Sequence, residues 1–199
     1  MRPAVFLDRD GTLIEQVHYL RDPRHVRVLQ GVCEALRLLH DAGYVCVVVS
    51  NQSAIGRGLM TEQDLDLVNA EMCRQLEVGG AQVDAHYHCP LAPRSADRTS
   101  VDHPDRKPGP GMLQRAARDL GLDLPRSWMV GDMKSDLLAG TNAGVRGSML
   151  VLTGNGRSTA DGVDRSYPIV EDLLAAARLI VGAAAMSPDC GQSERTVAP

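Results

Sequence analysis

The chain has 199 residues and a formal net charge of −4 at pH 7, with 44% hydrophobic and 23% charged residues. These proportions are close to those of globular proteins, and they argue against a disordered, collagen-like or coiled-coil chain. Apolar runs stay well short of the roughly 18 residues of a membrane span, and basic residues form no stripe suited to nucleic acid. Asp8 stands where a secretory signal would be apolar, and the five cysteines are scattered. We therefore expect a cytoplasmic, single-domain protein with neither a membrane nor a nucleic acid as partner.

Short, largely apolar segments alternate with helical patterns along the chain. Residues 4–7, 45–49, 128–130 and 148–152 have the composition of strands buried on both faces. Helical spacing predicts helices from residue 32 to a stop at Gly43, and over 61–76, 111–120, 137–143 and 170–180. This alternation predicts an α/β fold with a doubly wound parallel sheet. We expect one domain over residues 1–182, followed by a disordered tail over the small and polar residues 183–199.

Polar clusters follow each predicted strand. In a doubly wound sheet, ligands bind outside the carboxyl ends of the strands. Asp8 and Asp10 follow the first strand, residues 50–53 follow the second, and Asp132 follows the third. This regularity favours one site built at a single edge of the sheet.

The acidic clusters indicate a divalent cation. Asp8 and Asp10 are one residue apart, and two such carboxylates repel unless a cation or a shared proton relieves them. Asp132 and Asp136 have the four-residue spacing that puts both on one face of a helix. Taken singly, an Asp-rich turn and a solvated helix start explain the two pairs as well. Because both pairs converge at one edge of the sheet, they favour a Mg²⁺ site.

Hydrogen-bond donors for a phosphate come from two other segments. Ser50, Asn51, Gln52 and Ser53 offer hydroxyls, amides and main-chain N–H groups. Arg106 and Lys107 are adjacent cations in a segment rich in proline and glycine. A pair of basic residues is by itself most often solvated surface, so it gains meaning only from the other clusters.

The clusters together resemble, in order, the haloacid dehalogenase (HAD) superfamily of aspartate-nucleophile phosphatases. The resemblance covers residues 3–155 and rests on Asp8-Arg-Asp-Gly-Thr, Ser50, Lys107, and Gly131-Asp132 with Asp136. Residues 6–13, 50–58 and 106–112 are similar to the bacterial heptose 1,7-bisphosphate 7-phosphatases and to their relatives, the histidinol-phosphate phosphatases. Such a protein has a Rossmann-like core with short loop inserts and no large cap domain.

The resemblance implies roles for individual residues. Asp8 would be the nucleophile that forms an aspartyl-phosphate, and Asp10 the general acid and then the general base. Ser50 and Lys107 would bind the phosphoryl oxygens. Mg²⁺ would be held by Asp8, by the main-chain carbonyl of Asp10 and by Asp132, with Asp136 acting through a water or by orienting Lys107. The family's substrate-contacting positions are occupied here by Gln16, Val17, His18, Tyr19, Asn51, Gln52, Ser53 and Arg106.

Two departures from the family pattern stand out. Met133 occupies a position that is usually basic. The four positions of the family's zinc loop are Cys89, Leu91, His103 and Asp105. Leu91 has no ligand atom, and a carboxylate is a weak choice for structural zinc. We favour a loop held without zinc, and Cys89 and His103 are the candidate ligands if zinc does bind, with His86 or His88 as substitutes.

The sequence therefore predicts a Mg²⁺-dependent phosphatase that removes the 7-phosphate of a heptose 1,7-bisphosphate in lipopolysaccharide-type biosynthesis. Its partner is a small phosphorylated sugar, and the protein is a monomer or a small homo-oligomer. One alternative keeps the chemistry but takes histidinol phosphate or another small phosphate ester. A second alternative is a non-catalytic phosphosugar-binding protein, which the presence of both Asp8 and Asp10 disfavours, because binding alone does not require the second carboxylate.

Overall fold

The computed structural model describes residues 1–97 and 99–185, and its centre is one parallel sheet. The strand order is β3-β2-β1-β4-β5-β6. The strands are β1 (Ala4–Leu7), β2 (Val45–Asn51), β3 (Ala85–Cys89), β4 (Trp128–Gly131), β5 (Gly147–Val151) and β6 (Ile169–Val170). The order reverses between β1 and β4, which is where a doubly wound sheet binds its ligands. The predicted fold class is confirmed.

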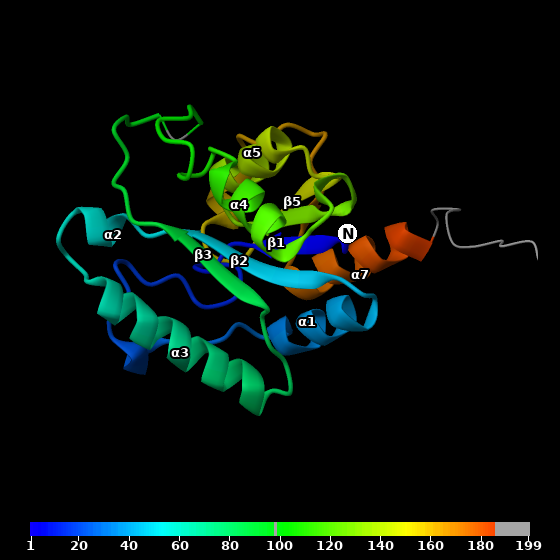
Figure 1. The fold of residues 1–199 in the computed structure, drawn as a ribbon, viewed down its shortest axis with the longest axis horizontal. Coiled ribbons are helices and arrows are strands. Elements are labelled where there is room, and N and C mark those ends of the chain that lie inside the picture. Colours follow the sequence, from blue (N-terminus) through cyan, green and yellow to red (C-terminus); the bar gives the residue numbers. More distant parts are fainter. Residues whose placement is uncertain (98, 186–199) are drawn as a thin grey trace, which may run out of the picture.

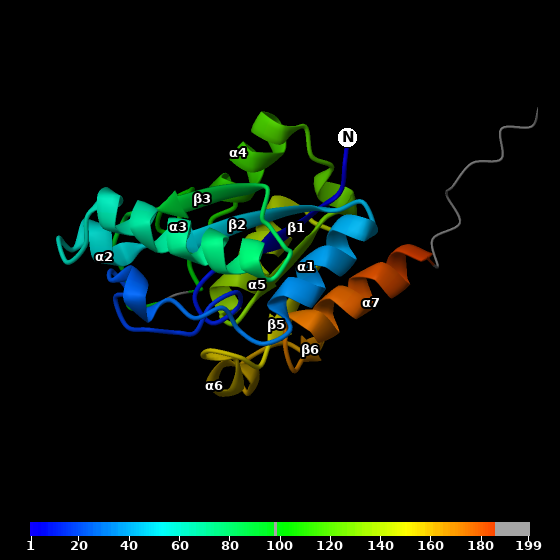
Figure 2. The same ribbon diagram turned by 90° about the horizontal axis from the view of Figure 1, so that it is seen from below.

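Helices cover both faces of the sheet (Figure 1). They are α1 (Val32–Asp41), α2 (Ser53–Gly56), α3 (Glu62–Val78), α4 (Gly111–Leu120), α5 (Lys134–Ala143), α6 (Gly156–Ala160) and α7 (Leu173–Ala185), with 3₁₀ turns η1 (Pro23–His25) and η2 (Leu124–Arg126). Figure 2 shows α1 and α7 side by side on one face and α4 on the other. None of the described helices is long and apolar enough to cross a membrane.

Alternate residues of each inner strand enter opposite halves of the core. Val5 and Leu7 of β1 pack in the cluster that contains α1, α3 and α7, whereas Ala4 and Phe6 pack against α4 and α5. All four are fully buried. Because neither face of these strands meets water, the strands carry unbroken apolar runs instead of the alternation of a half-exposed sheet.

A polar contact joins α1 to the N-terminal edge of the sheet. The Asp84 carboxylate, just before β3, accepts the main-chain N–H of Cys46 at 2.7 Å and lies 2.9 Å from Nε2 of His40. Asp84 thereby ties the end of α1 to β2, at the opposite end of the strands from the predicted site.

Two strands and the C-terminal boundary differ from the sequence prediction. The segment that forms β3 is Ala-His-Tyr-His-Cys, which lacks an apolar run because this edge strand is only partly buried. The second unpredicted strand, β6, has only two residues. Helix α7 continues to Ala185, past the expected domain boundary at residue 182, because its apolar residues pack on α1. The rest of the predicted tail, residues 186–199, lies outside the described residues.

Candidate active site

Three carboxylates meet at the reversal of strand order. Asp8 follows β1, Asp132 follows β4, and Asp136 lies in the first turn of α5. Each offers an oxygen that lies within 4.8 Å of an oxygen of the other two, and all three residues are at most 7% exposed. Burial, followed by the charge of Asp136, raises the pKa of Asp132 from 3.8 to about 7. Burial likewise raises the pKa of Asp8 well above its ordinary value, although Lys107 opposes the shift.

Lys107 neutralises part of this negative charge. Its Nζ lies 2.5 Å from Oδ1 of Asp8 and 2.8 Å from Oδ1 of Asp136, and it donates to the Val49 carbonyl at 2.8 Å. Burial alone would lower the pKa of Lys107, but the charges of Asp136 and Asp8 outweigh it and raise that pKa above its ordinary value. The ammonium group is therefore charged and fixed by three oxygens.

The Asn51 side chain holds the main chain of Lys107 in place. Its Nδ2 donates to the Lys107 carbonyl, and its Oδ1 accepts the Lys107 N–H, both at 3.0 Å. We predicted Asn51 as a substrate contact. It does line the site, but its amide is occupied by a residue 56 positions away. Asn51 thus supports the main chain of Lys107, and its contact with a substrate stays a prediction.

Asp132 has an oxygen suited to a metal ion. Its Oδ2 accepts the N–H and the Nδ2 of Asn155, at 2.7 and 3.1 Å. Its Oδ1 is buried and has no hydrogen-bond partner among the described residues. Gly11 and Gly154 approach from two sides with φ of +85° and +54°, and a Cβ on either would lie 2.4 Å from Oδ2. An unpartnered oxygen beside two further carboxylates is a hard-ligand set that fits Mg²⁺.

Asp10 lies beside the three carboxylates but has its own donors. Its Oδ2 accepts Nε2 of Gln52 at 3.0 Å and Nη2 of Arg9 at 2.9 Å. The same Nε2 of Gln52 lies 2.7 Å from Oγ of Ser50. We predicted Gln52 as a substrate contact, and the structure places its amide between Asp10 and Ser50. The Asp10 side chain is 19% exposed, and Asp10 lines the space in front of the site.

Two adjoining hollows provide space for a substrate. The first, of about 240 Å³, is lined by Asp8, Asp10, Gln16, Ser50, Asn51, Ser53, Arg106, Lys107, Met133, Ser135, Asp136 and Asn155. The second, of about 510 Å³, shares six of these residues and adds Arg9, Val17, His18, Tyr19, Leu20, Gln52, Ala54 and Arg57. The residues predicted for catalysis therefore surround the first hollow, and most of those predicted for substrate contact border the second.

Asn155, Ser135 and Arg9 are among the lining residues that the sequence analysis did not name as site residues. Asn155 follows β5 after Thr153 and Gly154, so the rule of polar residues at strand ends would have found it. Ser135 is the residue before Asp136 and carried no signal of its own. Arg9 was given no role of its own in the sequence analysis, and it is only 1% exposed.

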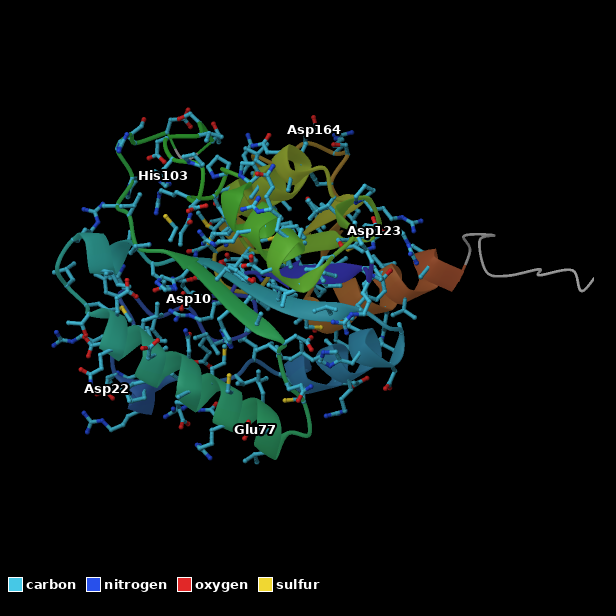
Figure 3. The ribbon with its side chains drawn as sticks, in the orientation of Figure 1. Asp10, Asp22, Glu77, His103, Asp123 and Asp164 are labelled. Atoms are coloured by element: carbon cyan, nitrogen blue, oxygen red, sulfur yellow. The ribbon has the colours of Figure 1, made fainter. Side chains whose placement is uncertain are left out.

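The predicted zinc ligands do not line the two hollows of the active site. Cys89 ends β3, and His103 lies in the loop after it, apart from Asp10 in Figure 3. Nδ1 of His103 accepts the N–H of Asp105, whose carboxylate pairs with Arg115 at 3.0 Å. Leu91 is 38% exposed. Within the described residues, Cys89 and His103 do not join a third His, Cys, Asp or Glu in a cluster of ligand atoms.

Comparisons with known proteins find a matching family model and similar phosphatases. A family model described as HAD-hyrolase-like matches residues 105–176. The D-glycero-beta-D-manno-heptose-1,7-bisphosphate 7-phosphatase of Haemophilus ducreyi is 38% identical over 174 residues, 87% of this chain and 95% of that protein. The D-glycero-D-manno-heptose-1,7-bisphosphate 7-phosphatase of Thermosynechococcus vestitus is 41% identical over 191 residues, 90% and 95% of the two chains.

Solved structures agree with these relatives. The D,D-heptose 1.7-bisphosphate phosphatase from B. bronchiseptica, complexed with magnesium and phosphate, superposes with a TM-score of 0.79 and 33% identity. The match covers 91% of this chain and 99% of that one. A putative HAD-like phosphatase from Mesorhizobium loti has a TM-score of 0.77 and 32% identity, over 98% and 90% of the two chains.

Proposed function

This chain belongs to the heptose-1,7-bisphosphate 7-phosphatase family of HAD-like hydrolases, and from that premise we propose that it removes the 7-phosphate of D-glycero-D-manno-heptose 1,7-bisphosphate. The chain is a phosphatase. The observation that carries the assignment of roles is the meeting of Asp8, Lys107, Asp132 and Asp136 at the reversal of strand order. Such an arrangement combines a nucleophile, a cation and a metal-ligand set within one buried site.

In the first step, a carboxylate oxygen of Asp8 attacks phosphorus and the ester P–O bond breaks. Asp10 transfers a proton to the departing sugar oxygen. In the second step, a water attacks the aspartyl-phosphate and gives its proton to the Asp10 carboxylate, while the bond between Asp8 and phosphorus breaks. The exposed part of the Asp10 side chain, on the wall of both hollows, supports this role.

Lys107 and Ser50 bind the phosphoryl oxygens, on which negative charge builds up during transfer. The ion pair between Lys107 and Asp136 supports an orienting role for Asp136. Asp8, Asp132 and the main-chain carbonyl of Asp10 are the groups that would hold Mg²⁺. When bound, this ion would offset part of the negative charge of the carboxylates and of the phosphoryl group.

The second hollow takes the rest of the substrate. Arg57, His18 and Tyr19 line it, and Arg106 lines the first hollow while its Nη1 donates to the Leu91 carbonyl at 2.8 Å. Hydrogen-bond donors outnumber aromatic rings along this wall. Such a wall suits a polyhydroxylated sugar with a second anion better than a flat imidazole, which favours the heptose bisphosphate over histidinol phosphate.

The nucleophile is tested by Asp8→Asn. We expect turnover to be abolished while the fold is retained, because the amide keeps the shape and Lys107 keeps Asp136 as a partner. Phosphate release is measured on the purified variant, and its melting temperature is compared with that of the wild type. Substantial turnover by a folded Asp8→Asn variant would remove the covalent mechanism.

The substrate is tested by steady-state kinetics on both phosphate esters. We expect kcat/KM for the heptose 1,7-bisphosphate to exceed that for histidinol phosphate at least about tenfold, or roughly 1.4 kcal/mol in transition-state binding. Faster turnover of histidinol phosphate would overturn the assignment of the heptose bisphosphate as substrate, but it would be consistent with the phosphatase mechanism. Binding of either ester without any phosphate release would instead support a non-catalytic phosphosugar-binding protein.

In this proposal the protein acts in the cytoplasm as a monomer or small homo-oligomer, with neither a membrane nor a nucleic acid as partner. Its four described cysteines are free thiols, which suit a reducing compartment.

A further inference from the structure

Arg9 is a buried cation that the reaction as described above does not use. It is the largest of the fully buried side chains, at 1% exposure, although it stands between Asp8 and Asp10 in the sequence. Its Nη2 lies 3.1 Å from Oδ1 and 2.9 Å from Oδ2 of Asp10, and its Nε lies 3.2 Å from Oδ2. A guanidinium and a carboxylate in this forked arrangement hold each other in one orientation.

Arg9 borders a very small cavity as well as the second hollow. The cavity that it shares with Ser50, Gln52, Asn69 and His86 has a volume of about 10 Å³, room for at most a single water. Burial, followed by the charge of Arg9, lowers the pKa of His86 below its ordinary value. Because Arg9 is only 1% exposed, protein groups must fix the position of its guanidinium.

Helix α3 holds the Arg9 guanidinium in position. Nη1 of Arg9 donates to Oδ1 of Asn69 at 3.0 Å. One turn and a half further along α3, Gln75 bonds to the N–H of Val28 and the carbonyl of Val26, each at 3.0 Å. The same helix therefore anchors Asp10 through Arg9 and also anchors the end of the loop that lines the second hollow.

The two oxygens of Asp10 are bonded unequally. Oδ2 accepts three hydrogen bonds, two from Arg9 and one from Gln52, whereas Oδ1 accepts a single one. An oxygen with three donors around it has little room for a proton. Oδ1 is thus the oxygen left to exchange a proton with the substrate.

We propose that Arg9, held by Asn69 of α3, is a positioning residue that aims Oδ1 of Asp10 at the leaving-group oxygen. This inference rests on the proposed role of Asp10 as general acid. Arg9 itself need not touch the substrate. Its contribution is to fix the acid, since a misplacement of about 1 Å costs on the order of 10²-fold in rate.

Leaving-group dependence separates this role from a merely structural one. An alkyl phosphate needs a proton on its departing oxygen, whereas an aryl phosphate with an acidic phenol leaves without one. Because kcat/KM reports the steps up to the first P–O cleavage, it isolates the acid from the later hydrolysis. The probes are a heptose or simple alkyl phosphate and p-nitrophenyl phosphate.

Two variants and one control carry the test. Arg9→Lys keeps the positive charge but loses the fork, and we expect kcat/KM to fall about 10- to 100-fold on the alkyl phosphate and less than about threefold on the aryl phosphate. Asn69→Ala leaves Arg9 in place and acts from α3, and we expect a fall of about fivefold on the alkyl phosphate alone. Gln63→Ala, an exposed amide of the same helix, should change neither.

Asp10→Asn is the reference for the whole series. Equal losses on both substrates in Arg9→Lys and Asn69→Ala, or no loss in either, would overturn the positioning role, provided that Asp10→Asn shows the leaving-group dependence. An Asp10→Asn variant without that dependence would instead overturn the role of Asp10 in the proposed function. If Arg9→Lys does not fold, Asn69→Ala decides the question alone.

Discussion

At the scale of single residues, the site depends on charges that are buried together and supported by side chains outside the reaction. Lys107 contacts Asp8 and Asp136, and its main chain is held on both sides by Asn51. A buried cation with fixed partners cannot move without losing several contacts at once. Its supports therefore affect both activity and stability.

Replacing Asn51 with alanine tests that support. We expect Asn51→Ala to lower the free energy of unfolding by about 1–3 kcal/mol, because the buried N–H and carbonyl of Lys107 lose their partners. Activity should fall as Lys107 shifts away from the phosphoryl oxygens. Denaturant unfolding and phosphate release measure the two effects. An Asn51→Ala variant with normal stability but a raised KM would contradict the supporting role and would indicate that Asn51 is a substrate contact.

At the scale of elements, α4 holds the loop that delivers Arg106 and Lys107 to the site. Asp105, the residue before them, pairs with Arg115 of α4 at 3.0 Å. The Arg115 guanidinium lies 5.6 Å from the ring centre of Tyr87 in β3, and the Tyr87 hydroxyl donates to Asp119 at 3.0 Å. Protein contacts thus connect the loop, α4 and the edge strand where the family pattern places a metal.

Arg115→Met tests whether this connection matters for the site. The pair is about one-third exposed on each side, so we expect a stability loss of less than about 1 kcal/mol. The loop should become less well positioned, and KM should rise about two- to fivefold. Arg118→Met, on the exposed side of the same helix, is the matched control. Identical kinetics in the two variants would show that the loop holds its position without Arg115.

Metal analysis tests whether the same loop binds zinc. In protein purified without chelator, we expect less than one zinc per chain, because Leu91 offers no ligand atom and the Asp105 carboxylate is paired with Arg115. Zinc content is measured by elemental analysis. One tightly held zinc per chain would contradict this expectation and would implicate Cys89 and His103.

At the scale of the whole molecule, the winding of the sheet determines which residues meet. β1 and β4 are neighbours although more than one hundred residues separate them, because the chain first winds outward through β2 and β3 and then returns. Asp8 and Asp132 stand at the ends of these two strands. Their mutual repulsion is therefore a property of the fold that a metal ion relieves.

The stability of the molecule should reflect this repulsion. With its pKa raised from 3.8 to about 7, Asp132 favours the folded state at low pH, and this contribution is lost as pH rises through that range. Mg²⁺ binds the ionised carboxylates. We therefore expect the increase in melting temperature on replacing EDTA by Mg²⁺ to be larger at pH 8 than at pH 5. Asp132→Asn should show little increase at either pH, and an equal increase at both pH values in the wild type would contradict the explanation.

Local physical chemistry in the sequence determined the main strands and the carboxylates at their ends. β1, β2, β4 and β5 lie where the apolar runs predicted them, because a strand buried on both faces leaves an unbroken run in the sequence. β3 left no such signal, since an edge strand that is only partly buried tolerates histidines and a tyrosine. Asp8, Asp10, Asp132 and Asp136 could be named because strand ends in such a sheet meet at one edge.

Only the tertiary structure decided what the polar side chains of the site contact. Asn51, Gln52 and Arg9 bond to Lys107, Asp10 and Asn69, which lie 56, 42 and 60 positions away in the sequence. Side-chain hydrogen bonds depend on distances of a few tenths of an ångström between elements that the sequence does not place relative to one another. An arginine between two aspartates has the same local pattern whether it is solvated or buried. Helix α3 shares a core cluster with β1 and β2, and the bond from its Asn69 is what holds the buried Arg9 in the site.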